Sequence, residues 1–188
     1  QKVPTDAVYT EELKELTKAL LVYGKNAAAV LKNGTTVEVA DVNWDNDIAD
    51  AAGSKVENAG VNLTDISLDL KSKIRLRVYF AVATGTIDDY TVNVNDAEVN
   101  VFETKDGENT VFCIDYAVYA KLLNTPVRIS IENAEGEKVL WLEMAPLYYA
   151  KIMATSENAP EGYENLMKAI KLYSDAADAY VASLKAQN

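Results

Sequence analysis

The chain contains no histidine and only one cysteine, Cys113. The absence of histidine excludes Ser-His-Asp and Cys-His catalysis, histidine-ligated zinc and the commonest general base. A single cysteine excludes an internal disulfide and any cysteine-rich metal site. Cys113 lies in an alternating segment, so we interpret it as a small buried hydrophobic residue rather than a nucleophile.

Long apolar runs and excess positive charge are also lacking. No segment reaches the roughly 18 unbroken apolar residues that span a membrane, and the first four residues lack the apolar stretch of a signal peptide. We therefore expect any export signal to have been removed or to belong to a longer parent. The 18 Lys and Arg residues against 29 Asp and Glu give a formal net charge of −11. Such a surface repels phosphates and anionic lipid, so we expect no nucleic-acid or membrane partner.

Apolar residues recur at helical spacing at both ends of the 188-residue chain. They predict a helix over residues 10–32, with Thr10 as N-cap and Asn33-Gly34 as a left-handed stop, and a second helix over 163–186. Between the helices, residues 35–145 are predicted to form a β-rich body. We expect residues 1–188 to form a single module.

Within this body the apolar period changes to two. Ile66, Leu68 and Leu70 alternate with polar residues, as do the apolar residues from Ile74 to Val82. Pairing the two runs as a hairpin puts both apolar sets on one face and Asp69 opposite Arg75. With further strands up to residue 144, the pattern predicts an α+β or mainly β fold. We expect an antiparallel β-sandwich of about seven or eight strands, with the terminal helices packed together alongside it.

The two terminal helices match each other when the chain is shifted by 150 positions, from Leu16 to Leu166. Identical pairs include Lys18 and Lys168, Tyr23 and Tyr173, and Ala27 and Ala177. Amphipathic helices rich in Ala and Leu often look alike, which is one interpretation. The other is a module that occurs in tandem, with this helix at each boundary.

The helix motif L-x-K-A-[L/I]-x-x-Y-[G/S]-x-x-A-x-A brackets a strand-rich stretch that contains Leu68-Asp69-Leu70 and residues 76–80. Over residues 8–184 this arrangement resembles repeat modules of large secreted or cell-surface proteins from Gram-positive anaerobic gut bacteria. The resemblance implies an extracellular, non-catalytic module in a family without an established general function. Residues 35–60 are not part of the shared pattern.

Residues 41–47 carry oxygen-bearing side chains at alternating positions, as a calcium loop does. The candidate ligands are Asp41, Asn43, Asp45 and Asp47. Asn46 stands where such a loop usually has glycine, and Ala52 stands where it has a bidentate acid. The alternatives are a calcium site and a solvated acidic loop, and no other cofactor is expected.

Trp44 lies in the same polar stretch, without core periodicity around it. An exposed indole beside Asp41, Asn43 and Asp45 suits stacking on a sugar ring, with hydrogen bonds to its hydroxyls. The alternative is that Trp44 anchors its own loop. Trp141 alternates out of phase with Leu140 and Leu142, so it is either a core residue, which we favour, or an aromatic on an exposed sheet face.

Tyr79 and Tyr90 fall on the wet side of their predicted strands and could extend an aromatic platform. The 29 acidic residues do not single out a catalytic pair, so we expect no enzyme. The predicted ligand-binding set is Trp44, Asp41, Asn43, Asp45, Tyr79, Tyr90 and Trp141.

Two functions remain open. The first is an extracellular or cell-surface carbohydrate-binding module of a bacterial multi-domain protein, whose partners are a polysaccharide or surface glycan and the other modules of the parent. The second is a structural or adhesive spacer repeat with no small-molecule ligand. The exposure of Trp44 is predicted to distinguish them.

Overall fold

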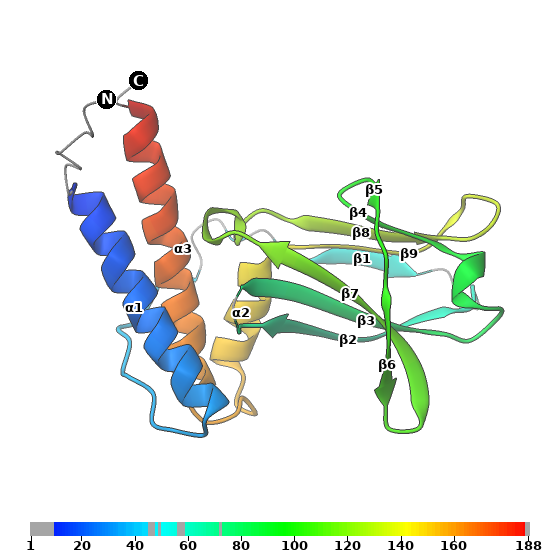
Figure 1. Ribbon diagram of the computed structural model, residues 1–188, viewed down its shortest axis with the longest axis horizontal. Coiled ribbons are helices and arrows are strands. Elements are labelled where there is room, and N and C mark those ends of the chain that lie inside the picture. The colour runs from blue at the N-terminus through cyan, green and yellow to red at the C-terminus, as the bar shows by residue number, and fades with distance from the viewer. Residues whose placement is uncertain (1–9, 45–47, 49, 56–58, 72, 187–188) are drawn as a thin grey trace, which may run out of the picture. The chain divides into compact units, whose positions relative to one another are not determined.

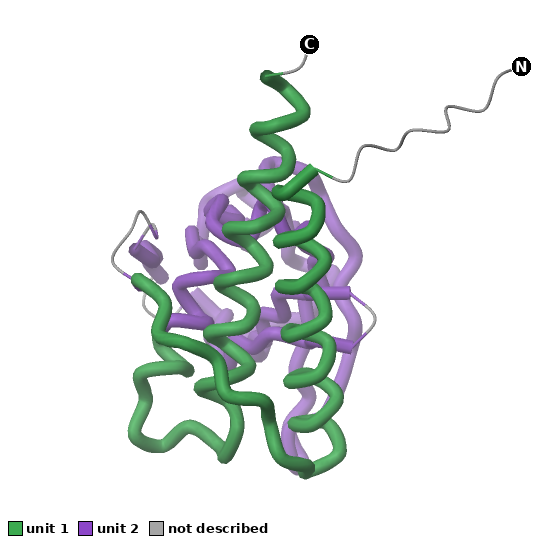
Figure 2. Tube along the Cα trace, turned by 90° about the vertical axis from the view of Figure 1, so that its left-hand side faces the viewer, with its two compact units in different colours: residues 1–43, 152–188 green, residues 44–151 purple. Residues whose placement is uncertain are grey.

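The protein is described by a computed structural model that covers residues 10–44, 48, 50–55, 59–71 and 73–186. These residues form nine strands in two antiparallel sheets, three α-helices and two short 3-10 helices, as Figure 1 shows. The chain divides into two compact units (Figure 2). Unit 1 comprises residues 1–43 and 152–188, and unit 2 comprises residues 44–151.

The five-stranded sheet of unit 2, called sheet A, has the order β1-β9-β8-β4-β5. Its strands are β1 (Ala52–Lys55), β9 (Lys138–Met144), β8 (Val127–Glu132), β4 (Thr91–Val94) and β5 (Ala97–Glu98). Strands β8 and β9 form the hairpin at the centre, with a register shift between Ile131 and Glu132. A 3-10 helix, η1 (Ile87–Asp89), precedes β4.

The four-stranded sheet, called sheet B, has the order β2-β3-β7-β6. Its strands are β2 (Val61–Asp69), β3 (Ile74–Val82), β7 (Asn109–Val118) and β6 (Phe102–Asp106). The predicted hairpin is confirmed, because Asp69 lies directly opposite Arg75. A second 3-10 helix, η2 (Ala120–Leu122), follows β7.

The core of unit 2 lies between the inward faces of the two sheets. Strands β3 and β8 alternate, so the apolar side of each is buried while the polar side is not. The fully buried side chains include Leu76, Val78, Phe80 and Ile114 from sheet B and Ile129 and Ile131 from sheet A. The α+β class and the sandwich arrangement are thus as predicted, with two short strands, β1 and β5, beyond those expected.

Unit 1 contains the paired helices α1 (Glu11–Leu31) and α3 (Tyr163–Ala186). The predicted N-cap is confirmed, because the Thr10 hydroxyl accepts a hydrogen bond from the Leu13 N–H at 3.2 Å. The predicted stop is also confirmed, because Asn33 has a φ of 51° just after the helix. Tyr23 of α1 and Tyr173 of α3 stack with ring centroids 5.6 Å apart.

The segment that follows α1 is held by side chains of unit 1. Buried Asn26 accepts the N–H of Val37 at 2.9 Å, and Asn165 of α3 accepts the N–H of Val39 at 3.1 Å. These contacts keep residues 36–39 against the helices. The remaining helix, α2 (Pro146–Thr155), follows β9 directly, and its Leu147 N–H donates to the carbonyl of Leu123 at 2.9 Å.

Candidate functional site

The outer face of sheet A is organised by a tight turn between β4 and β5. Asn95 and Asp96 have φ values of 51° and 64°, the left-handed pair that a two-residue hairpin turn requires. The Asn95 side chain accepts the Arg128 N–H at 3.0 Å, and the Asn95 N–H donates to the Arg128 carbonyl at 2.7 Å. The turn therefore holds Asp96 beside Arg128, whose guanidinium lies 3.0 Å from the Asp96 carboxylate.

Trp141 lies on this outer face, with 37% of its surface exposed. Its neighbours in register are Ser54 of β1 and Ser130 of β8, two small residues that leave room over the sheet for an indole ring. The interpretation of Trp141 as a core residue is therefore wrong. The inward phase of β9 is taken by Leu140, Leu142 and Met144.

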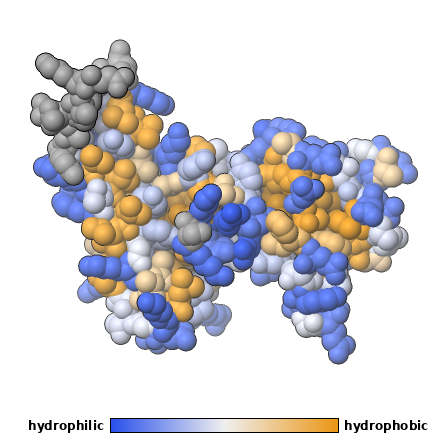
Figure 3. Space-filling view, in the orientation of Figure 1, coloured by the Kyte–Doolittle hydropathy of each residue, from blue (hydrophilic) through white to orange (hydrophobic). Residues whose placement is uncertain are grey.

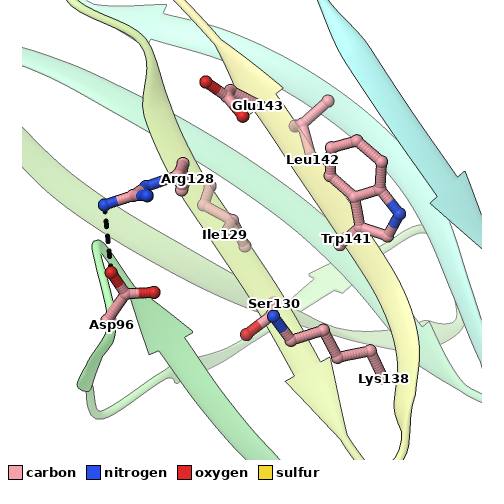
Figure 4. Close-up of a pocket in the computed structure, with 8 residues that line it drawn as sticks. All are labelled: Asp96, Arg128, Ile129, Ser130, Lys138, Trp141, Leu142 and Glu143. Carbon is pink, nitrogen blue, oxygen red and sulfur yellow. Dashed lines mark hydrogen bonds and ion pairs between the residues drawn. The ribbon is translucent and has the colours of Figure 1, made fainter.

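A depression of about 270 Å³ lies on the same face (Figure 4). Its lining residues are Asp96, Arg128, Ile129, Ser130, Lys138, Trp141, Leu142 and Glu143. Glu143 and Arg128 are direct cross-strand partners. The two cations of the lining match its two anions, so the indole is surrounded by hydrogen-bonding groups of balanced charge.

This arrangement offers a stacking surface and hydrogen-bonding groups side by side. An indole face stacks on apolar C–H groups, and the guanidinium, carboxylate and hydroxyl groups beside it can exchange hydrogen bonds with ligand hydroxyls.

The outer face of sheet B carries a second group of aromatic and charged residues. It has two adjoining depressions of about 380 and 440 Å³, both lined by Tyr79 and Thr104. Exposed Phe102 and the partly buried Arg77 and Asp115 line only the first. The wet-side placement predicted for Tyr79 is thus what the structure shows.

The charged residues of this face pair with one another. The Asp115 carboxylate lies 2.9 Å from the guanidinium of Arg75 and 3.3 Å from that of Arg77. The Arg77 guanidinium also lies 2.7 Å from the carboxylate of Asp69. Asp69 therefore pairs diagonally with Arg77, although Arg75 stands directly opposite it. Because these guanidinium and carboxylate groups already satisfy each other, they hold β2, β3 and β7 together rather than offering hydrogen bonds to a ligand.

Two titratable groups lie beside Phe102 on this face, because Cys113 is the cross-strand partner of both Phe102 and Tyr79. Burial raises the pKa of the Cys113 thiol and the pKa of the Tyr79 hydroxyl. A raised thiol pKa lowers the thiolate fraction, which is the nucleophilic form. The interpretation of Cys113 as a buried hydrophobic residue is confirmed.

Tyr90 forms hydrogen bonds with the backbone around it. Its hydroxyl donates to the carbonyl of Thr84 at 3.0 Å and lies 3.3 Å from the carbonyl of Ala59. Gly60, with a φ of 81°, passes so close that a Cβ there would meet the Tyr90 hydroxyl. Tyr90 thus fastens the chain before β2 to the end of β3, and it lines none of the three depressions described above.

The predicted residues of the 41–47 segment are only partly described. Asp41 is exposed and lies 2.8 Å from the Lys168 ammonium, which lowers the pKa of the Asp41 carboxyl. Asn43 is exposed and Trp44 is half-buried, while Asp45 and Asp47 lie outside the described residues. The boundary between the two units falls between Asn43 and Trp44. The calcium alternative therefore stays a prediction.

The described part of the chain lacks two kinds of feature. That part holds no group of three or more His, Cys, Asp or Glu side chains placed to bind a metal ion. It also has no helix that is both long and apolar enough to cross a membrane.

The sequence pattern missed most of the polar groups around Trp141. Glu143 shares its strand phase with Trp141, and Arg128 and Ser130 share a phase on the paired strand, so alternation could have found these three. Asp96 could not be found in this way, because only the turn between β4 and β5 brings it to Arg128.

Comparisons of the chain with family models, with curated proteins and with solved structures give no match. The resemblance to repeat modules of secreted bacterial proteins therefore stays a prediction.

Proposed function

We propose that the protein is a non-catalytic carbohydrate-binding module and that Trp141 is its principal binding residue. The observation that carries the proposal is an indole exposed on a sheet face between two serines, with Arg128 and Glu143 beside it. A pyranose ring stacked on the indole would place its hydroxyls within reach of these polar groups.

A neutral polysaccharide is the ligand class that fits this face best. Arg128 and Lys138 are balanced by Asp96 and Glu143 in the lining, so neither an anionic nor a cationic sugar gains a net attraction. The depression is open rather than a closed pocket, which suits a segment within a long chain as well as a chain end. Binding to such a surface is weak per site, because little of the ligand is buried.

The proposal moves the binding residue from Trp44 to Trp141. Trp44 is half-buried, so its exposure does not decide between ligand binding and loop anchoring. Trp141 has both an exposed ring and polar groups that share its depression. Tyr79 and Phe102 also give the opposite sheet an aromatic face, but the charged groups beside them are already paired.

The cellular setting that we propose is extracellular or on a bacterial cell surface, within a multi-domain parent. A glycan-binding module would keep the parent near its polysaccharide, and the other modules of that parent would be its further partners. The acidic surface, with a net charge of −11, supports the expectation of no nucleic-acid or membrane partner.

The test is affinity electrophoresis of the chain through gels that contain neutral or charged soluble polysaccharides, with pull-down on insoluble ones. Wild type is compared with Trp141→Ala, Trp44→Ala and Phe102→Ala, the last being a matched exposed aromatic on the opposite sheet. We expect retardation by at least one neutral polysaccharide, a loss of binding of about tenfold or more in Trp141→Ala, and little change in Phe102→Ala.

Two results would contradict the proposal. Binding that survives Trp141→Ala but is lost in Trp44→Ala would return the site to the 41–47 segment. Retention by no polysaccharide in either assay would favour the spacer function instead.

A further inference from the structure

The outer face of sheet A carries a line of residues that crosses all of its strands. The register pairs Trp141 of β9 with Ser54 of β1 and with Ser130 of β8. It also pairs Ser130 with Asn93 of β4, and Asn93 with Glu98 of β5. Because directly paired residues point to the same side of a sheet, these side chains form one line across the strands, which we call the cross-strand row.

The cross-strand row is polar on the β8 side of Trp141. The Ser130 hydroxyl donates to the Glu132 carboxylate at 3.3 Å, and its oxygen can still accept a hydrogen bond. Asn93 alternates with buried residues of β4, so its amide lies on the outer face. The side chains of Asn93 and Glu98 form no hydrogen bond or ion pair with another residue that the structure describes. An amide and a carboxylate are therefore available to a ligand.

Longer charged side chains flank the cross-strand row on both sides. On one side, Arg128 and Glu143 are cross-strand partners, and Asp96 pairs with Arg128. On the other side, Lys138 and Glu132 are cross-strand partners. The depression drawn in Figure 4 is lined by residues from both sides and by the part of the row around the indole. The row is therefore a low path between two charged borders.

The spacing of the cross-strand row suits an extended sugar chain. Neighbouring strands lie about 4.8 Å apart, which is close to the length of one sugar unit in an extended polysaccharide. A chain that crosses the strands would therefore meet a new side chain of the row about once per unit. From Trp141 to Glu98 the row crosses β8 and β4, a span of about 14 Å, which accommodates about three further units. A chain along the strands would instead run into the charged borders.

Apolar surface is also exposed in unit 1, but it does not orient a ligand. Apolar side chains are visible along the helix pair in Figure 3, and Leu20 and Leu21 of α1 are exposed. The hydrophobic effect is non-directional, so such a surface does not select one ligand. The cross-strand row combines an aromatic ring with hydrogen-bonding groups at regular spacing, which favours one kind of ligand in one direction.

We propose that a neutral polysaccharide chain crosses the strands of sheet A, from Trp141 of β9 to Glu98 of β5. This inference rests on the proposed function, and it adds Asn93 and Glu98 as binding residues outside the depression around Trp141. One sugar unit stacks on the indole, and the following units exchange hydrogen bonds with Ser130, Asn93 and Glu98 in turn. The protein therefore binds the interior of a chain, about four units at a time.

The test is NMR titration of the protein with cello-, xylo- and manno-oligosaccharides from the dimer to the hexamer. We expect at least one series to bind, with an affinity that rises up to the tetramer and then levels off. Asn93→Ala should weaken the binding of the tetramer and longer oligosaccharides by about fivefold, the effect of one lost hydrogen bond. It should leave the dimer unchanged, because the dimer reaches from Trp141 only to β8.

The matched control is Thr91→Ala. Thr91 lies on the same strand and face as Asn93 but outside the cross-strand row, because its cross-strand partner is Glu132. This variant should bind oligosaccharides of every length as wild type does. Trp141→Ala should lose binding at every length, and circular dichroism confirms that each variant is folded.

Two outcomes overturn the path across the strands: an affinity that does not change beyond the dimer, and an Asn93→Ala variant that binds the hexamer as wild type does. If binding still depends on Trp141 in either case, the proposed function stands without this inference. Binding of no series, or binding that Trp141→Ala leaves unchanged, contradicts the proposed function and this inference together. A loss that grows with length in Asn93→Ala and is absent in Thr91→Ala supports the inference.

Discussion

The outer faces of the two sheets of unit 2 both combine aromatic rings with charged side chains, but they use the charges differently. On sheet B, Asp115 and Asp69 neutralise Arg75 and Arg77 in a network whose side chains are largely covered. On sheet A, Arg128 and Asp96 form an exposed pair beside Trp141, and Glu143 and Lys138 line the same depression.

The difference shows that residue type alone does not identify a binding surface. Arginine, aspartate and an aromatic ring occur on both faces, yet only on sheet A do water-exposed polar groups surround an exposed indole. Covering an ion-pair network costs desolvation free energy, and the attraction between the paired groups offsets that cost. Because the pairing needs one geometry, the network stabilises one arrangement of strands. An exposed pair contributes little to stability and can exchange its partner for a ligand.

The largest expected effect is a difference in stability between substitutions on the two sides of β9. Leu142→Ala removes a buried side chain from the core, and we expect a loss of about 3 kcal/mol in unfolding free energy, or a fall in Tm of about 6 to 12 °C. Trp141→Ala, one residue earlier on the outer face, should cost about 1 kcal/mol. Thermal and urea denaturation measure both, and equal losses would show that Trp141 belongs to the core after all.

A smaller difference in stability is expected between substitutions of an acidic residue on each of the two sheet faces. Asp115→Asn keeps the shape of the side chain but leaves Arg75 and Arg77 without their shared anion, at a cost of about 2 kcal/mol. Asp96→Asn, which retains a residue tolerant of the left-handed turn, should cost about 0.3 kcal/mol, because both partners of its ion pair are exposed. If urea denaturation gave both variants the same midpoint, the contrast between the faces would be lost.

The smallest effect concerns alkaline pH. Burial raises the pKa of Cys113 and of Tyr79 on sheet B, so above their ordinary values of 9.0 and 10.0 the unfolded chain loses these protons first. The stability that both groups contribute is therefore complete below pH 9.0 and is lost as the pH rises through their higher folded-state values. We expect the unfolding free energy of wild type to fall more steeply from pH 8 to pH 11 than that of Cys113→Ala.

The matched control for the alkaline measurement is Val111→Ala, which removes buried apolar atoms from β7 and no titratable group. Its slope against pH should follow that of wild type. A Cys113→Ala variant with the slope of wild type would mean that folding does not raise the pKa of the Cys113 thiol.

The elements predicted well are those whose pattern is local. Thr10 and Asn33 frame α1 because capping depends on a few neighbouring residues. Asp69 and Arg75 lie opposite each other because a short hairpin and the period of two fix the register. The prediction that Trp141 is a core residue was wrong because a local pattern was not enough there. Both phases of β9 carry large apolar residues, so alternation could not tell which phase faces inward.

By itself, the sequence determined the alternation and the helix stripes, and with them two sheets with one apolar face each and a pair of amphipathic helices. It also excluded histidine-dependent catalysis and histidine-ligated zinc, because the chain contains no histidine. Only the tertiary structure decided which side of β9 is covered and that Asp96 meets Arg128. Both depend on contacts between residues far apart in the chain, which local periodicity does not encode.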